Sequence, residues 1–155
     1  MLFRSFILRS DGSGGQYLYM PAGGSLNPSS VETVQRKMHY VHQDGKNVFK
    51  HAVRGMADVS EEILHKHGLT AKDIKLYIPH QANLRIIQAA ADRMNLDASQ
   101  VAINIDRYAN TTAATIPICL SEAVESKAIV KNDVVLLASF GAGFTWGSLL
   151  LRWEA

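Results

Sequence analysis

Residues 133–153 read DVVLLASFGAGFTWGSLLLRW. This stretch holds two apolar runs, residues 133–139 and residues 144–153, and both are predicted to be strands. Little more than Gly141, Ala142 and Gly143 lies between them. Since a crossover between parallel strands takes about a dozen residues, so short a connection predicts that the two strands are antiparallel neighbours.

Helices and strands are predicted to alternate ahead of these two strands. From Asn47 to Ile63 apolar residues recur at three- and four-residue steps, which predicts a helix that ends at Gly68. Strands are predicted at residues 75–79 and 101–105, and helices from about Asn83 and over residues 112–126. The order α, β, α, β, α, β, β predicts an α/β fold with a mixed β-sheet flanked by helices.

The first thirty residues are predicted to form a hairpin and a loop. Residues 2–8 and 16–20 are apolar runs, and the turn-forming sequence Asp-Gly-Ser-Gly-Gly separates them. Residues 21–30 are small, polar and interrupted by Pro28, so they are expected to form a loop. Ser29 or Ser30 is predicted to cap a short helix that runs to about His42.

Composition excludes several classes of protein. The chain has 155 residues, 47% of them hydrophobic and 19% charged, which fits one globular domain. Its formal net charge of +2, without a dense basic run, argues against a nucleic-acid partner. No apolar run reaches the roughly 18 residues of a membrane span, and the apolar start is too short for a signal peptide. We therefore expect a soluble, cytoplasmic protein with no membrane partner.

The cysteine and histidine content argues against disulfides and metals. Cys119 is the single cysteine, which excludes an intrachain disulfide and a multi-cysteine zinc site. The pairs His39 with His42 and His65 with His67 have no carboxylate or cysteine partner at ligand spacing, so no metal site is predicted.

Three predicted strand ends carry residues suited to chemistry. In open α/β sheets the ligand crevice lies beyond the carboxyl ends of the strands, and His80, Asn110 and the bend at residues 141–143 follow three such ends. An imidazole, an amide and free backbone N–H groups can together stabilise a developing oxyanion. Each of these residues also has a purely structural interpretation. His80 can be a hydrogen-bonded histidine, Asn110 and the nearby Asn83 can each cap a helix, and Gly141 and Gly143 can form a tight turn.

Three strings carry a resemblance to a known family. IPHQANLRII at 78–87, DRYANTTAATIP at 106–117 and SFGAGFTWGSLLLRW at 139–153 resemble the carboxy-terminal motifs of β-ketoacyl-acyl-carrier-protein synthase III, a thiolase-fold enzyme. The resemblance extends over essentially the whole chain, including residues 45–49. It implies the carboxy-terminal half of a thiolase-like fold, with residues 1–29 as closing strands of a missing amino-terminal half plus a connecting loop, and residues 30–155 as the carboxy-terminal half-domain.

The resemblance also implies a decarboxylative Claisen condensation. A short acyl group passes from coenzyme A to a cysteine, and malonyl-acyl carrier protein then loses carbon dioxide and attacks that thioester to start fatty-acid synthesis. His80 and Asn110 match the catalytic pair that stabilises the enolate, and Ala142 matches a backbone N–H of the oxyanion hole. Both thioesters are substrates, so no cofactor is implied.

Further residues match binding positions of that family. Gly45, Phe49, Ala82 and Asn83 match the pantetheine tunnel, Phe140 matches a residue that shields the thioester, and Lys50 and Arg85 match the rim where acyl carrier protein docks. Ala109 and Ala142 depart from the family, which commonly has glycine at both positions. The implied partners are acyl carrier protein, the missing amino-terminal half and a second copy in a homodimer.

No residue of this sequence matches the nucleophilic cysteine of the family. Cys119 lies in the middle of a predicted helix, where a small buried thiol is expected rather than a reactive one. The chain alone is therefore expected not to complete the condensation. Two alternatives stay open: a cysteine hydrolase that combines Cys119 with a histidine and an asparagine, and a non-catalytic acyl- or carrier-protein-binding module.

Overall fold

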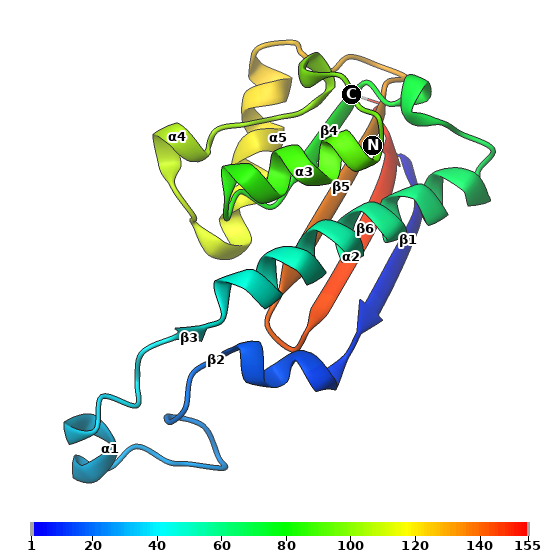
Figure 1. The fold of residues 1–155 in the computed structure, drawn as a ribbon. Helices are drawn as coiled ribbons and strands as arrows, with labels where there is room; N and C mark the ends of the chain where they lie inside the picture. Colours follow the sequence, from blue (N-terminus) through cyan, green and yellow to red (C-terminus); the bar gives the residue numbers. More distant parts are fainter. Residues whose placement is uncertain (1, 155) are drawn as a thin grey trace.

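The centre of the fold is a mixed four-stranded sheet. The computed structural model of the chain describes residues 2–154. The strands are β1 (Leu2–Ser10), β4 (Leu76–Pro79), β5 (Val134–Gly141) and β6 (Thr145–Arg152), in the spatial order β1-β6-β5-β4 (Figure 1). β5 runs parallel to β4, and β6 is antiparallel to both β5 and β1. The predicted α/β class and mixed sheet are confirmed.

The hairpin of β5 and β6 is confirmed as predicted. Phe140 pairs with Trp146 and Gly141 with Thr145, so the turn occupies residues 142–144. Gly143 has φ +139°, a backbone conformation that side chains other than glycine's rarely adopt. The glycine at 143 is therefore required by the turn itself.

The predicted amino-terminal hairpin is wrong in its pairing. The first run is indeed strand β1, but it pairs with β6, with Ile7 opposite Ser148. Residues 12–17, which include the first two residues of the second run, form a 3-10 helix, η1 (Gly12–Tyr17), because the Asp11 carboxylate accepts the Ser13 backbone N–H and starts a helical turn. β2 (Leu18–Tyr19) pairs instead with β3 (His42–Gln43) in a separate two-stranded sheet. The domain boundary between residues 29 and 30 stays a prediction.

The predicted strand at residues 101–105 is also wrong. Only one bridge forms there, between Val101 and Tyr77, and a short helix, α4 (Ile105–Tyr108), follows it. The physical reason lies in Asn104, whose backbone N–H donates to the Gln81 side chain rather than to a neighbouring strand. Side-chain hydrogen bonds thus replace the ladder at this position.

The helices largely follow the sequence prediction. α2 (Gly45–Lys66) begins at an Asp44 cap and is followed by Gly68 at φ +65°, and α3 (Leu84–Arg93) begins at an Asn83 cap. The predicted third helix is divided into η4 (Thr112–Ala114) and α5 (Thr115–Glu125). α1 (Val31–Gln35) has the predicted Ser30 cap but ends earlier than predicted. Two short 3-10 helices, η2 (Ala71–Asp73) and η3 (Ala98–Gln100), flank β4 and α3.

Helices cover both faces of the sheet, but unequally. α2 and α3 lie on one face of the sheet (Figure 1). Met56, Ile63 and Leu136 are almost fully buried in the core on that face. α5 packs on the opposite face, where Cys119 and Val135 share a second core cluster. The segment that carries β2, α1 and β3 extends away from the sheet (Figure 1).

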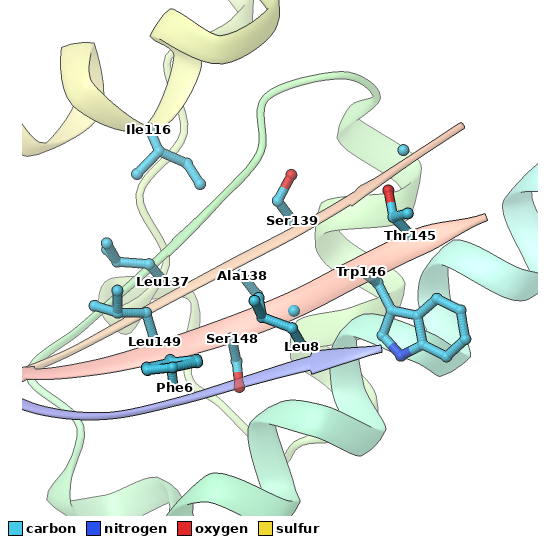
Figure 2. Close-up of a pocket in the computed structure, with 12 residues that line it drawn as sticks. Phe6, Leu8, Ile116, Leu137, Ala138, Ser139, Thr145, Trp146, Ser148 and Leu149 are labelled. Carbon is cyan, nitrogen blue, oxygen red and sulfur yellow. The ribbon is translucent and has the colours of Figure 1, made fainter. Parts of the chain in front are cut away.

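An apolar groove lies on the opposite face beyond α5. It has a volume of about 580 Å³, and Figure 2 shows Phe6, Leu8, Leu137 and Leu149 from three strands facing it below Ile116 of α5. Phe6 is 54% and Leu8 68% exposed, which is unusual for large apolar side chains on a sheet face. In the described part of the chain, no helix is both long and apolar enough to cross a membrane.

Candidate active site

The carboxyl ends of β4 and β5 bring two of the predicted site segments to one edge of the sheet. His80 directly follows β4, and its backbone N–H donates to the Ala138 carbonyl of β5 at 2.8 Å. The bend at residues 141–144 lies a few residues further along β5. Because β4 and β5 are parallel, the histidine and the bend emerge at the same end of the sheet.

The imidazole of His80 is held by the first residue of α5. Its Nδ1 lies 2.6 Å from the hydroxyl Oγ1 of Thr115, a side chain that is only 2% exposed. Burial lowers the pKa of His80, since desolvation penalises the charged ring. His80 is thus partly buried and hydrogen-bonded, as its structural interpretation in the sequence analysis expected. Because Nδ1 is used in this hydrogen bond, Nε2 is the ring nitrogen that can contact a ligand.

Asn110 closes a turn rather than capping a helix. Its side-chain Oδ1 accepts the backbone N–H of Thr112 at 2.9 Å, whereas α5 begins at Thr115 and has Ala114 at its N-cap, without any side-chain cap. The oxygen of the amide is therefore used locally, and the Nδ2 protons of this exposed side chain have no protein partner among the described residues. Asn110 is thereby prepared to donate to a ligand.

The backbone on both sides of Asn110 is strained. Ala109 adopts φ +56° and ψ −159°, close to a region that is essentially restricted to glycine, and Thr112 has φ +54°. Glycine would adopt this conformation without strain, which agrees with the glycine that the resemblance described above implies at position 109.

Three side chains that the sequence analysis did not select connect the site segments. Gln81 is fully buried, and its amide Nε2 donates to the carbonyls of Pro79 at 2.9 Å and Ala102 at 3.1 Å. Its Oε1 accepts the backbone N–H of Asn104 at 3.0 Å, and the Asn104 side chain donates to Glu122 of α5 at 2.9 Å. This chain of hydrogen bonds joins the end of β4 to α5 through the segment that precedes Asn110.

Glu122 also receives donors from α4. Arg107 contacts both carboxylate oxygens, at 2.6 and 2.7 Å, and the Tyr108 hydroxyl donates at 3.0 Å. The hydrogen bond from Asn104 is the main reason that the pKa of Glu122 lies below its usual value. No sequence pattern marks Gln81, Asn104 and Glu122 as partners, because up to 41 positions separate them and only the fold brings them together.

Several of the predicted binding residues lie around a second cavity. It has a volume of about 440 Å³ and is lined in part by Gly45, Phe49, Asn83 and Arg85. The Arg85 guanidinium lies 5.6 Å from the centre of the Phe49 ring, within range of a cation–π contact. Asn83 also caps α3 by accepting the Arg85 backbone N–H, so its structural role is confirmed.

The remaining predicted residues lie outside that cavity. Ala82 and Lys50 are exposed, on the turn before α3 and on α2 respectively. Ala142 is exposed at the tip of the bend, where its carbonyl accepts the Thr145 hydroxyl at 3.0 Å. Phe140 is 8% exposed and packs against Phe144, with ring centres 4.8 Å apart.

Cys119 has the environment of a structural thiol. It is 3% exposed within the core cluster between α5 and the sheet, and burial is the main cause that raises its pKa to about 11. Since the thiolate is the nucleophilic form, this environment argues against a cysteine hydrolase. Among residues 2–154, no group of three or more His, Cys, Asp or Glu side chains is placed to hold a metal ion.

Solved structures share this arrangement of strands and helices. Synthase III from Thermus thermophilus aligns with a TM-score of 0.84 at 45% identity, over 98% of this chain and 46% of that one. The enzyme from Pseudomonas aeruginosa PAO1 aligns with a TM-score of 0.87 at 36% identity, over 99% of this chain and 46% of that one. The chain therefore has the thiolase-like α/β fold of condensing enzymes.

Sequence comparison narrows this class to one family. The family described as 3-oxoacyl-[acyl-carrier-protein (ACP)] synthase III C terminal matches residues 64–153. The β-ketoacyl-[acyl-carrier-protein] synthases III of Koribacter versatilis and Chlorobium phaeobacteroides are each 54% identical, over 92% and 95% of this chain. The chain belongs to the β-ketoacyl-acyl-carrier-protein synthase III family. It spans 43% and 45% of the length of these two relatives, and the family model that it matches is that of the carboxy-terminal part.

Proposed function

We propose that this chain is the carboxy-terminal portion of an acyltransferase that condenses a short acyl-CoA with malonyl-acyl carrier protein. The observation that carries the proposal is the pair of donors, the His80 ring and the Asn110 amide, each held through its other polar atom by the fold. In this reaction the malonyl group loses carbon dioxide, and the electrons of the broken C–C bond form an enolate. The enolate carbon then attacks an acyl thioester, and the cysteine thiolate leaves.

The two donors would act on the decarboxylation step. As carbon dioxide leaves, negative charge accumulates on the malonyl thioester oxygen, and donors aimed at that oxygen lower the barrier. His80 would donate from Nε2 and Asn110 from Nδ2, neither of which is used by the protein among the described contacts. Loss of one such donor typically costs about 3 kcal/mol of transition-state stabilisation.

The binding residues would guide the carrier arm to these donors. The cavity beside Gly45, Phe49 and Asn83 suits a pantetheine arm because it combines an aromatic wall with polar groups. Ala82 would contact the same arm, and Lys50 and Arg85 would attract the acidic carrier protein. Phe140 would shield the thioester, and the Ala142 backbone N–H would stabilise the tetrahedral oxyanion of the acyl-transfer step. The acyl and malonyl groups would come from the two substrates and the nucleophile would be a cysteine side chain, so the reaction would need no cofactor.

Acyl transfer would depend on a cysteine outside these residues. Cys119 is buried and its pKa is raised, so it does not suit the nucleophile's role. The nucleophile would come from an amino-terminal half, which would also cover the apolar groove over β1, β5 and β6. The intact enzyme would be a homodimer, and this chain alone would not complete the condensation.

The test separates decarboxylation from condensation. In the first assay the chain is incubated with malonyl-acyl carrier protein as the only substrate. In the second assay the chain is fused to the amino-terminal part of the Koribacter versatilis relative, and the fusion receives malonyl-acyl carrier protein together with acetyl-CoA. We expect condensation only from the fusion, and a loss of decarboxylation of about 100-fold in His80→Ala or Asn110→Ala. His65→Ala, on the exposed side of α2, serves as the control. Carrier-protein binding with no carbon dioxide release from either protein, unchanged in His80→Ala, would instead support a non-catalytic binding module.

A further inference from the structure

The hydroxyl of Thr115 lies between two groups that can accept its proton. Oγ1 is 2.6 Å from Nδ1 of His80 and 3.1 Å from the carbonyl oxygen of Thr112. A threonine hydroxyl has one proton to donate, although its oxygen can accept as well. If the proton points to the Thr112 carbonyl, Nδ1 must donate to Oγ1. If it points to the imidazole, Nδ1 must accept.

The direction of this proton determines the chemistry of the other ring nitrogen. A neutral imidazole carries one proton, so a ring that accepts at Nδ1 is a donor at Nε2, and the reverse also holds. We propose that Thr115 is a positioning residue that holds His80 in the Nε2–H form by donating its hydroxyl proton to Nδ1. This inference rests on the proposed function, in which Nε2 must donate to the enolate oxygen.

The distances favour this direction. A hydroxyl donor typically lies about 2.5–3.0 Å from an oxygen acceptor, whereas an N–H donor lies about 2.7–3.2 Å from oxygen. The separation of 2.6 Å between Oγ1 and Nδ1 fits a hydroxyl donor and is short for an N–H donor. The longer contact of 3.1 Å then belongs to the carbonyl that does not receive the proton.

The Thr112 carbonyl does not need the hydroxyl proton. It already accepts the backbone N–H of Thr115 in the 3-10 turn of η4. When the hydroxyl points to His80, every buried group in this contact therefore still has a partner. Turning the proton to the carbonyl would add a second donor there and leave Nε2 without a proton.

Burial protects the arrangement from water. Thr115 is 2% exposed, so solvent does not compete for its hydroxyl. Desolvation lowers the pKa of His80 and so favours the neutral ring, the state in which the two tautomers differ. Thr115 is also the first residue of α5, and α5 is joined through Glu122 to Asn104, Arg107 and Tyr108. One helix therefore orients the ring and anchors the segment ahead of Asn110.

Nitrogen NMR of the chain labelled with ¹⁵N-histidine tests the tautomer directly. At a pH where the ring is neutral, we expect the His80 signals to show a protonated Nε2 and a hydrogen-bonded, unprotonated Nδ1. Thr115→Ser keeps the hydroxyl and should keep this pattern. Thr115→Val removes it, so Nδ1 should shift to the position of a ring nitrogen without a donor, and the excess of the Nε2–H form should fall by roughly 2- to 10-fold.

Two results would overturn the inference. One is a proton on Nδ1 in the unaltered chain, and the other is an Nδ1 signal that Thr115→Val leaves unchanged. The amide spectrum reports whether each variant is folded, and the spectrum of the unaltered chain decides the tautomer even if Thr115→Val does not fold. Decarboxylation of malonyl-acyl carrier protein separates this inference from the proposed function. If decarboxylation requires His80 but the ring proton is found on Nδ1, the inference about Thr115 is wrong and the proposed function stands. If the ring is in the Nε2–H form but no decarboxylation occurs, the proposed function is wrong and the tautomer inference stands.

Discussion

Replacing Ala109 with glycine should stabilise the chain, although such a change normally weakens a protein. Ala109 has φ +56° and ψ −159°, and a residue other than glycine in this region costs about 1–3 kcal/mol. Glycine releases that strain but loses more backbone entropy on folding, about 0.5–1 kcal/mol. The difference is a net gain of about 1 kcal/mol, which corresponds to a rise in Tm of about 2–4 °C for a chain of this size.

Ala142→Gly provides a matched control for this prediction. Ala142 is also an exposed alanine, but its φ is not positive. It has no strain of this kind to release, so glycine there should lower the free energy of unfolding by up to about 1 kcal/mol. Urea denaturation followed by circular dichroism measures both changes. If Ala109→Gly lowers the midpoint, or if both variants raise it equally, the strain at Ala109 is not the cause.

Gln81→Leu leaves two carbonyls and the Asn104 N–H unpaired in the interior, so urea denaturation should show that the free energy of unfolding falls by about 3 kcal/mol. The control Gln88→Leu, at an exposed position, should change the free energy of unfolding by less than about 0.5 kcal/mol. The pKa of Glu122 is lowered chiefly by the hydrogen bond from Asn104. The ionised carboxylate therefore stabilises the folded chain at pH values above the pKa that Glu122 has in the unfolded chain, and this stabilisation is lost as the pH falls through its pKa in the folded chain. The difference in Tm between the chain and Glu122→Gln should therefore shrink on acidification, and a constant difference would contradict this account. Burial raises the pKa of Cys119 to about 11, so iodoacetamide should label the native chain far more slowly than the urea-unfolded chain, and equal rates would refute its burial.

Local patterns predicted the elements that are stabilised by their own residues. The β5–β6 hairpin, α2 and the Asn83 cap of α3 were all predicted, because periodicity, capping and turn chemistry act within a few residues. The two wrong predictions concern pairing. Strand β1 was expected to pair with residues 16–20, and residues 101–105 were expected to form a strand. Pairing depends on partners distant in the chain, which no local pattern specifies.

The same distinction applies to the site. His80 and Asn110 were selected by their positions after predicted strands, and the resemblance to the family assigned their roles. Gln81, Asn104, Thr115 and Glu122 were not selected, because a buried glutamine or a helical glutamate has no distinctive local signal. The hydrogen bonds that join His80 to Thr115, Gln81 to Asn104 and Asn104 to Glu122 span 18 to 35 positions in the sequence and became visible only in three dimensions.

The amino-acid sequence by itself determined the fold class and the family and selected His80 and Asn110 as the proposed donors, because these depend on short motifs and their order along the chain. Only the tertiary structure decided that β1 completes the sheet beside β6 and that one face of the sheet retains an apolar groove. It also decided that the Asn110 amide oxygen is used by its own turn and that Thr115 holds the His80 ring. The physical reason is that strand pairing, burial and the direction of a shared proton are set by groups that meet only when the chain has folded.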